Sequence, residues 1–282
     1  MPFQVFQANA GSILSATTGF IAQAGFTHSL TPARNCTFGC TYCYVPTMRI
    51  YGGLKAEDCR HWGQFTTFKT NAPELLRRQL RADQVIYCSP LVDLYQPAEE
   101  REQLMPRILD ELLLTPPRVF VIQTRGPLIV RDLARLVALS RQTVLRVSFS
   151  LTTNREDVRK LYEPHCATIA CRLKTIRILR EAGITSFATL APILPCDPEE
   201  LAGLALEATD QDIIGDPLHI RSVKSRGATT REAAFTISQK HEFSAWLDSD
   251  FQAGVLERIG AIARGAGRKF GTGTEGFGWL AQ

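Results

Sequence analysis

Residues 35–44 read Asn35-Cys36-Thr37-Phe38-Gly39-Cys40-Thr41-Tyr42-Cys43-Tyr44, so that three cysteines fall within one short segment. The spacing is Cys-x3-Cys-x2-Cys, and a loop of this length can wrap its sulfurs around one corner of a metal cluster, because thiolate is the ligand that iron–sulfur centres take. Three protein ligands leave one metal position open, as chemistry at a metal requires. The segment therefore predicts an iron–sulfur site with Cys36, Cys40 and Cys43 as the metal ligands.

The composition is that of an ordinary globular protein with room for a large core. The chain has 282 residues, of which 45% are apolar and 21% charged, enough for one large α/β domain or two small ones. The net charge of +4 is too small to establish a nucleic-acid footprint, and DNA binding stays open. We find no apolar run of about 18 residues that would span a bilayer and no signal peptide in residues 1–10. We therefore expect a cytoplasmic protein with reduced cysteines.

Short apolar runs recur along the chain, each too short for a helix and bounded by Pro, Gly or polar residues. They predict buried strands at residues 26–30, 85–88, 119–123, 144–151, 186–190 and 218–220. Helical patterns lie between them: one apolar face contains Leu133, Leu136 and Val137, and another runs from Ile169 to Leu179. Gly183 is expected to end the second helix.

The alternation of strands and helices predicts a parallel sheet with right-handed crossovers. About six βα units are fewer than the eight of a closed barrel. We therefore expect an α/β fold with a partial (β/α)6 TIM-type barrel, the alternative being an open doubly wound sheet. In both, the chemistry lies at the carboxyl ends of the strands. Residues 1–220 are expected to form this domain, with an N-terminal extension over about 1–24, and residues 221–282 a C-terminal helical extension.

The C-terminal extension contains two patterns that need interpretation beside its expected helix over 239–264. Gly271-x-Gly273-x-x-Gly276 is spaced like a dinucleotide fingerprint, which works only between a strand and the helix that it opens. Because six residues follow Gly276, we expect no such helix and interpret the tail as flexible or strand-capping. The basic residues Arg221, Lys224, Arg226 and Arg231 could track phosphates or form a solvated loop.

The cysteine loop, with Tyr42 between its last two cysteines, resembles the signature of the radical S-adenosylmethionine (SAM) enzymes. Segments 93–99, 124–126, 131–133, 148–152, 163–164, 172–173 and 191–195 are similar in order and spacing to the spore photoproduct lyase-like subgroup, often labelled DNA repair photolyases. The resemblance covers about residues 28–195. It implies a [4Fe–4S] cluster whose open iron chelates SAM, cleavage of SAM to a 5′-deoxyadenosyl radical, and hydrogen abstraction from a substrate. It also implies a low-potential electron donor of the flavodoxin or ferredoxin type.

The resemblance also implies cofactor contacts at the strand ends. Tyr42 would lie against the adenine, and the residues at the places where relatives bind SAM are Ser89, Thr124, Arg125 and Ser150. The Gly-Gly-Glu segment of many radical enzymes is absent, and Asp93 could supply its carboxylate. Arg125 stands where the relatives have lysine, and its fork suits a carboxylate. The alternative for the serines, Thr124 and Asp93 is a helix-capping or turn role.

Cys88 ends the second expected strand of the barrel, near the place where spore photoproduct lyase has a hydrogen-donating cysteine. The resemblance implies a catalytic role for Cys88, and the alternative is a small packed hydrophobe. Cys59, Cys166, Cys171 and Cys196 have no spacing that suggests a second cluster. Cys166 and Cys171, five residues apart on one expected helix, are expected to face apart and to be structural.

Other interpretations of the three-cysteine motif stay open, the simplest being three buried thiols. A structural zinc site would need a fourth ligand, and the nearest candidates are Cys59 and His61. A protein of another class would be a non-catalytic iron–sulfur or zinc module that binds or senses. Within the enzyme interpretation, the substrate could be a DNA lesion, a protein side chain or a small molecule.

Overall fold

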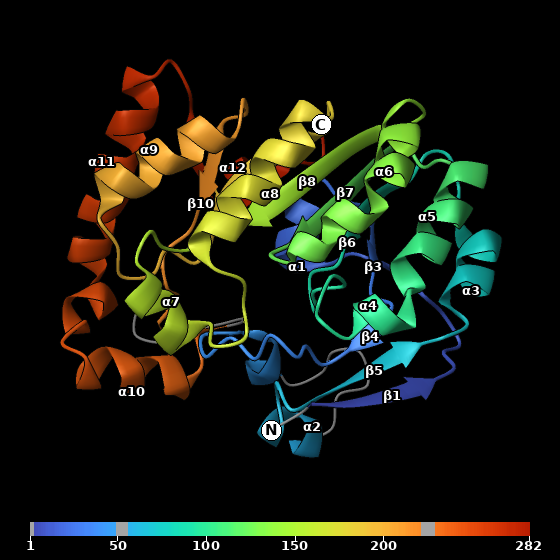
Figure 1. Ribbon diagram of the computed structural model, residues 1–282, viewed down its shortest axis with the longest axis horizontal. Helices are drawn as coiled ribbons and strands as arrows, with labels where there is room; N and C mark the ends of the chain where they lie inside the picture. Colours follow the sequence, from blue (N-terminus) through green and yellow to red (C-terminus); the bar gives the residue numbers. More distant parts are fainter. Residues whose placement is uncertain (1–2, 49–55, 221–228) are drawn as a thin grey trace.

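A mostly parallel sheet forms the centre of the computed structural model, which describes residues 3–48, 56–220 and 229–282 (Figure 1). Its eight strands lie in the order β11 (Phe270–Thr272), β10 (Ile213–Gly215), β9 (Thr185–Leu190), β8 (Val144–Ser150), β7 (Val119–Thr124), β6 (Val85–Cys88), β3 (His28–Leu30) and β2 (Leu14–Ala16). All neighbours pair in parallel except β2, which pairs antiparallel with β3. Among the described strands β11 and β2 are edges, so the sheet is an open, partial barrel as expected.

A second, smaller sheet packs beside the first. It contains β1 (Gln4–Ala8), β5 (Phe65–Lys69) and the short β4 (Ala33–Arg34). β1 and β5 are parallel, whereas β4 runs antiparallel to β5 and leads directly into the cysteine loop. This sheet therefore supports the start of the predicted metal site.

Helices follow most strands of the large sheet. They are α1 (Gly19–Gln23), α2 (Ala56–Arg60), α3 (Ala72–Gln79), α4 (Glu99–Glu102), α5 (Leu104–Leu114), α6 (Leu133–Ser140), α7 (Glu156–Tyr162), α8 (Ile169–Glu181), α9 (Pro198–Ala208), α10 (Glu232–Lys240), α11 (Ser249–Gly265) and α12 (Gly273–Gly278). Three short 3-10 helices are η1 (Val45–Thr47), η2 (Pro127–Asp132) and η3 (Ser244–Leu247). In the described ranges, none of the helices combines the length and apolar character needed to cross a bilayer.

The central strands are apolar on both faces, as parallel strands covered on both sides must be. Ile86 and Ile122 face one buried cluster, to which α5, α6, α8 and α9 contribute, and Figure 1 shows α5, α6 and α8 in front of the sheet. Tyr87 and Val121 alternate with them and face a second cluster, which includes Phe277 of α12 and contacts α1. The two clusters fix the register, because a slip of one residue would exchange the two faces.

Most of the expected elements are confirmed. The strands predicted at 85–88, 119–123, 144–151 and 186–190 match β6, β7, β8 and β9 within one residue at each end, and the run at 26–30 contains β3. The two expected helices are α6 and α8, and Gly183 follows the end of α8 with a φ of +79°. That left-handed backbone favours glycine.

The C-terminal part of the chain corrects three expectations. The strand predicted at 218–220 is wrong, because the sixth parallel strand is β10, which closes with Gly215. The expected helix over 239–264 is interrupted after α10, where Glu242 has a φ of +61° and Asp248 caps the start of α11. The expectation that no helix follows the glycine-rich strand is wrong: β11 extends the sheet beside β10, and α12 follows it directly.

The glycines of that tail serve close packing between β11 and α12. A Cβ on Gly276 would lie 2.5 Å from the backbone of Gly271, and a Cβ on Gly271 would lie 2.4 Å from the ring of Trp279. The fingerprint spacing is therefore explained by backbone contact. β11 belongs to the main sheet, and α11 packs on α9. The domain boundary that we expect at residue 220 stays a prediction.

Gly126 allows the loops that follow β6 and β7 to touch. A Cβ at Gly126 would lie 2.2 Å from the backbone oxygen of Tyr95, whereas Gly203, in the middle of α9, has open space around it. We expect Gly126→Ala to lower the free energy of unfolding by about 1–3 kcal/mol through overpacking. Gly203→Ala is the matched control and should raise it by up to about 1 kcal/mol. Denaturant titration checks both, and an unchanged Gly126→Ala protein would contradict the described contact.

Candidate functional site

The cysteine loop is held in place by polar side chains on both sides. Asn35, whose φ is +61°, accepts hydrogen bonds on its side-chain oxygen from the backbone N–H groups of Cys36 (2.7 Å) and Gly63 (3.0 Å). Thr37 donates from its N–H and its hydroxyl to the side-chain oxygen of Gln96, each at 2.9 Å. The loop is thereby fixed between the small sheet and the segment that follows β6.

The three motif thiols are arranged more openly than ligands of a single ion. Two sulfurs on one tetrahedral metal ion lie about 3.8 Å apart, given metal–sulfur bonds of about 2.3 Å. In the described part of the chain, the one group of three ligand atoms within 4.8 Å of one another is Cys40, Cys166 and Glu163, not the motif itself. At least two of the motif sulfurs are thus farther apart than 4.8 Å, which does not fit three ligands of one ion, whereas in a cluster each cysteine binds a different iron.

The fourth ligand that the zinc interpretation requires is not supplied by the two nearest candidates. The imidazole of His61 contacts Glu57 through Nε2 at 2.7 Å and Gln64 through Nδ1 at 3.2 Å. Cys59 belongs to α2 and is half-buried. The structure therefore gives no support to a closed tetrahedral site made with either residue.

The surroundings of the thiols affect their ionisation. Burial, followed by the nearby Asp93, raises the pKa of Cys36, and burial raises the pKa of Cys43 to about 12. The pKa of Cys40 is lowered, mainly by its contact with Cys166. Because iron–sulfur clusters bind thiolates, binding of a cluster by these cysteines would release protons from the buried thiols.

A buried network of charged groups joins the cysteine loop to the sheet. Glu163, at the end of α7, accepts a hydrogen bond from the hydroxyl of Tyr42 and is paired with Arg125 at 2.5 Å. Its second oxygen accepts from Arg172 of α8, and Arg125 also donates to the Tyr42 hydroxyl. The guanidinium carbon of Arg125 lies 5.7 Å from the centre of the Tyr42 ring. The network fixes the aromatic residue of the motif.

Glu163 carries a negative charge in this network although its side chain is 0% exposed. Burial alone would raise the pKa of Glu163, but Arg172 and Arg125 lower it to about 2. The carboxylate is therefore ionised at neutral pH and neutralises part of the charge of the two arginines. A buried carboxylate without its arginine partners would strongly destabilise the folded protein.

Three hydroxyls at the strand ends have no hydrogen-bond partner although they are buried. They belong to Ser89, directly after β6, to Ser150, the last residue of β8, and to Thr152, two residues later. Buried hydroxyls are normally paired, so these groups are open for a bound molecule. They lie at the carboxyl edge of a parallel sheet, where ligands of such folds bind. The donor set therefore fits a polar cofactor beside the cysteine loop.

Asp93 and Thr124 bind each other and join the loops after β6 and β7. Asp93 accepts hydrogen bonds from the Thr124 hydroxyl (2.7 Å), the Arg125 N–H (2.7 Å) and the Tyr95 N–H (2.9 Å). Burial raises the pKa of Asp93, although these hydrogen bonds act in the opposite direction. Asp93 and Thr124 therefore lie at the carboxyl edge of the sheet, as predicted. Their hydrogen bonds also stabilise the turns there, which was the alternative role expected for them.

Cys88 ends β6, as predicted, and is buried. It shares its apolar cluster with Ile86 and Ile122. Burial, followed by Asp93, raises the pKa of Cys88, so its thiol keeps its proton at neutral pH. The residue therefore has the S–H form that a hydrogen-atom donor needs, in packing typical of a small hydrophobe.

Sequence reasoning missed part of this site. In the sequence, Glu163, Arg172 and Thr152 stand out only because they lie in segments similar to the spore photoproduct lyase-like subgroup. No role was predicted for any of them. The expectation that Cys166 and Cys171 share a helix is wrong, because Cys166 precedes α8 and contacts Cys40. A buried acidic residue beside two arginines is a tertiary arrangement, and no local signal in the sequence indicates it.

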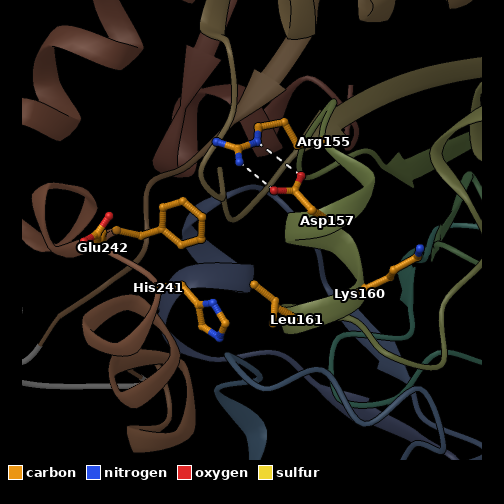
Figure 2. A pocket seen from close by; sticks show the side chains of 7 residues that line it. Arg155, Asp157, Lys160, Leu161, His241 and Glu242 are labelled. Atoms are coloured by element: carbon orange, nitrogen blue, oxygen red, sulfur yellow. Dashed lines mark hydrogen bonds and ion pairs between the residues drawn. The ribbon is translucent and has the colours of Figure 1, made fainter.

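A separate surface pocket of about 680 Å³ lies between α7 and the turn after α10 (Figure 2). It is lined by Arg155, Asp157, Lys160, Leu161, His241, Glu242 and Phe243. Arg155 pairs with Asp157 at 2.6 Å and lies over the ring of Phe243. None of the predicted site residues lines this pocket, and two of its charged side chains, Arg155 and Asp157, pair with each other.

The fold and the site define a class of protein: a parallel βα fold with a three-cysteine loop and unpaired buried hydroxyls at its carboxyl edge. The family model of the Radical SAM superfamily matches residues 30–205, which is more than half of the chain. The chain therefore belongs to the Radical SAM superfamily of enzymes. Membership implies SAM and an iron–sulfur cluster as cofactors, a source of electrons, and a substrate.

Curated relatives are distant. An uncharacterized protein of Mycobacterium tuberculosis is 28% identical over 174 residues, covering 60% of this chain and 50% of that protein. An uncharacterized protein of Methanocaldococcus jannaschii is 26% identical over 160 residues, covering 57% and 58%. The chain thus spans about half the length of the mycobacterial relative.

Solved structures of spore photoproduct lyase share the fold. The complex of that enzyme with dinucleoside spore photoproduct has a TM-score of 0.56 and 14% identity, and the match covers 84% of this chain and 66% of that chain. A variant of the same enzyme with bound AdoMet and dinucleoside spore photoproduct has a TM-score of 0.55 and 15% identity, with the same coverage.

Glu163→Gln should destabilise the protein by about 3–5 kcal/mol, because it leaves Arg125 and Arg172 buried without their carboxylate. The pKa of Glu163 is lowered on folding, so its stabilising effect is present above the unfolded value near 4.5 and is lost as the pH falls toward 2. Denaturant titration at several pH values should show that the difference in the free energy of unfolding between the parent and Glu163→Gln becomes smaller below about pH 4.5. Glu199→Gln, which removes an exposed pairing with Arg258, is the control and should change little. Equal stability of Glu163→Gln and the parent at pH 7 would contradict this account.

Proposed function

We propose that this chain binds a [4Fe–4S] cluster through Cys36, Cys40 and Cys43 and reductively cleaves SAM to a 5′-deoxyadenosyl radical, which abstracts hydrogen from a substrate. The observation that carries the proposal is the set of partnerless buried hydroxyls beside the three-cysteine loop. When bound, the cluster supplies the low-potential electron and an iron that chelates the methionyl group of SAM. The protein supplies the ligands, the orientation and a site closed to water.

The side chains at the strand ends would hold SAM. Ser89, Ser150 and Thr152 have hydroxyls free to pair with its polar groups. Tyr42 would lie against the adenine, with its ring held by Arg125 and Glu163. The lasting positive charge of Arg125 suits a carboxylate.

Asp93 and Thr124 are assigned to the methionyl end of the cofactor. Their mutual hydrogen bond of 2.7 Å fixes both side chains before any ligand arrives. A preformed polar site reduces the ordering that binding would otherwise require.

Cys88 is proposed to return a hydrogen atom to the product radical. Its protonated thiol at the end of β6 supports this role. The thiol would lose a hydrogen atom and become a thiyl radical, which one electron from the proposed low-potential donor and one proton would return to the thiol.

The electron is proposed to come from a flavodoxin- or ferredoxin-like donor in the cytoplasm. The chain has eight cysteines, which a reducing compartment would keep as thiols. We further propose residues 1–220 as the catalytic domain, with residues 221–282 as an extension packed on it.

Formation of 5′-deoxyadenosine tests the reaction. Anaerobically reconstituted protein should bind about four irons and release 5′-deoxyadenosine when dithionite and SAM are added. Cys36→Ala and Cys43→Ala should lose the cluster and fall to background, because each removes a ligand that no neighbouring thiol replaces. Cys171→Ala, in a half-buried cysteine of α8, is the matched control and should behave like the parent.

Persistent absence of 5′-deoxyadenosine from protein that holds its full complement of iron would refute the enzymatic proposal and favour a binding or sensing module. Tetrahedral zinc in place of iron would refute the cluster as well.

A lesion in DNA is the substrate class that we propose to test first, because the fold is similar to that of an enzyme solved with dinucleoside spore photoproduct. The basic residues Arg221, Lys224 and Arg226 lie outside the described residues, while Arg231 is described. A protein that neutralises DNA phosphates releases their counterions, so its affinity depends on salt. With several phosphate contacts, the affinity for duplex DNA should fall by roughly tenfold or more between about 50 and about 200 mM salt. Affinity that does not respond to salt would contradict a DNA substrate and favour a protein side chain or a small molecule.

A further inference from the structure

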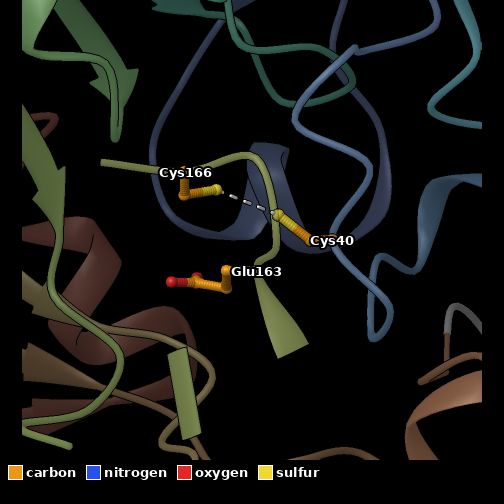
Figure 3. A group of neighbouring side chains, drawn as sticks. All are labelled: Cys40, Glu163 and Cys166. Atoms are coloured by element: carbon orange, nitrogen blue, oxygen red, sulfur yellow. Dashed lines mark hydrogen bonds between the residues drawn. The ribbon is translucent and has the colours of Figure 1, made fainter. Parts of the chain in front are cut away.

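Cys166 brings a second thiol against one of the predicted cluster ligands. The sulfur atoms of Cys40 and Cys166 lie 3.9 Å apart, although 126 positions separate the two residues in the chain, and both side chains are buried (Figure 3). Cys40 belongs to the motif, whereas Cys166 lies in the loop between α7 and α8. The contact therefore comes from the tertiary structure alone.

Both sides of this contact are held by hydrogen bonds of the backbone. Arg159 donates from one nitrogen to the backbone oxygens of Glu163 (3.1 Å) and Cys166 (2.9 Å), and the Cys166 N–H donates to Glu163 O at 3.1 Å. On the other side, the Thr41 N–H donates to the backbone oxygen of Tyr162 at 2.9 Å. The distance between the two sulfurs is therefore set by the fold.

The spacing of these two sulfurs would fit one metal ion, but the third candidate ligand beside them is already engaged. An oxygen of Glu163 lies within 4.8 Å of both sulfurs, but its carboxylate is already paired with Arg125 and Arg172. Two buried arginines beside the carboxylate would repel a further cation. In the described part of the chain, the sulfur of Cys40 is the hydrogen-bonding partner of the Cys166 thiol.

We propose that Cys166 donates an S–H hydrogen bond to the thiolate of Cys40 and thereby raises the reduction potential of the bound cluster. The inference rests on the proposed function. Once Cys40 binds iron, its sulfur carries no proton and can only accept, so the donor must be Cys166. Hydrogen bonds to an ionised acceptor are the stronger kind.

The direction of the effect follows from charge. Reduction adds an electron to the cluster and makes its sulfurs more negative, so a donor stabilises the reduced form more than the oxidised form. Hydrogen bonds to the sulfurs are one of the factors that set cluster potentials. Cys166 therefore makes the cluster easier to reduce.

A redox titration of the reconstituted protein, followed by electron paramagnetic resonance without SAM, tests the inference. Cys166→Ala should bind the same amount of iron but have a lower potential, so that at the parent's midpoint the ratio of reduced to oxidised cluster falls at least threefold. For one electron this corresponds to about 30 mV. Cys166→Ser keeps a donor and should remain close to the parent, and Cys171→Ala is the control without a sulfur contact.

An unchanged or higher potential in fully loaded Cys166→Ala would overturn the inference and leave the proposed function intact. Failure of the parent protein to bind iron would instead refute the proposed function. If Cys166→Ala does not load, vibrational spectroscopy of the loaded parent decides. An S–H stretching frequency that is lowered by hydrogen bonding in the parent and is absent from Cys166→Ser would support Cys166 as the donor. A parent protein without this lowered S–H stretch would overturn the inference.

Discussion

The buried carboxylate of Glu163 is the contact on which the assembly of the site depends. It binds Tyr42 of the cysteine loop, Arg125 after β7 and Arg172 of α8, so one side chain joins three separate parts of the chain. Each arginine would be costly to bury alone. Together these contacts fix the cysteine loop over the carboxyl edge of the sheet, where Ser89 and Ser150 have free hydroxyls. The position of the proposed cofactor thus follows from electrostatic pairing in the core.

Much of the fold could be predicted because its central strands are buried on both faces. Such strands appear in the sequence as continuous apolar runs, and β6 to β9 were found within one residue at each end. β10 was missed because it contains Gly215, which indicates a turn in the sequence. In the structure a Cβ there would lie 2.6 Å from the ring of Phe270 on β11, so glycine is required by a neighbour that is distant in the chain.

The site shows the same division between local and tertiary information. The metal ligands follow from a local spacing, and the polar strand ends follow from the rule that parallel folds bind ligands at one edge. Cys166 and Glu163 could not be found this way, because the loop that presents them is positioned by Arg159 and Arg172. Asp248 did offer a local signal, since it caps α11 with two hydrogen bonds, and it marks the break in a helix that was expected to continue.

The central claim is that three thiolates leave one iron open for SAM. Electron–nuclear double resonance of the reduced, loaded protein with SAM labelled at its amino nitrogen and carboxylate measures this directly. The account predicts hyperfine coupling from both labels to the cluster, lost when unlabelled SAM competes. A cluster that shows no coupling to either label would contradict it, because every iron would then be closed by the protein.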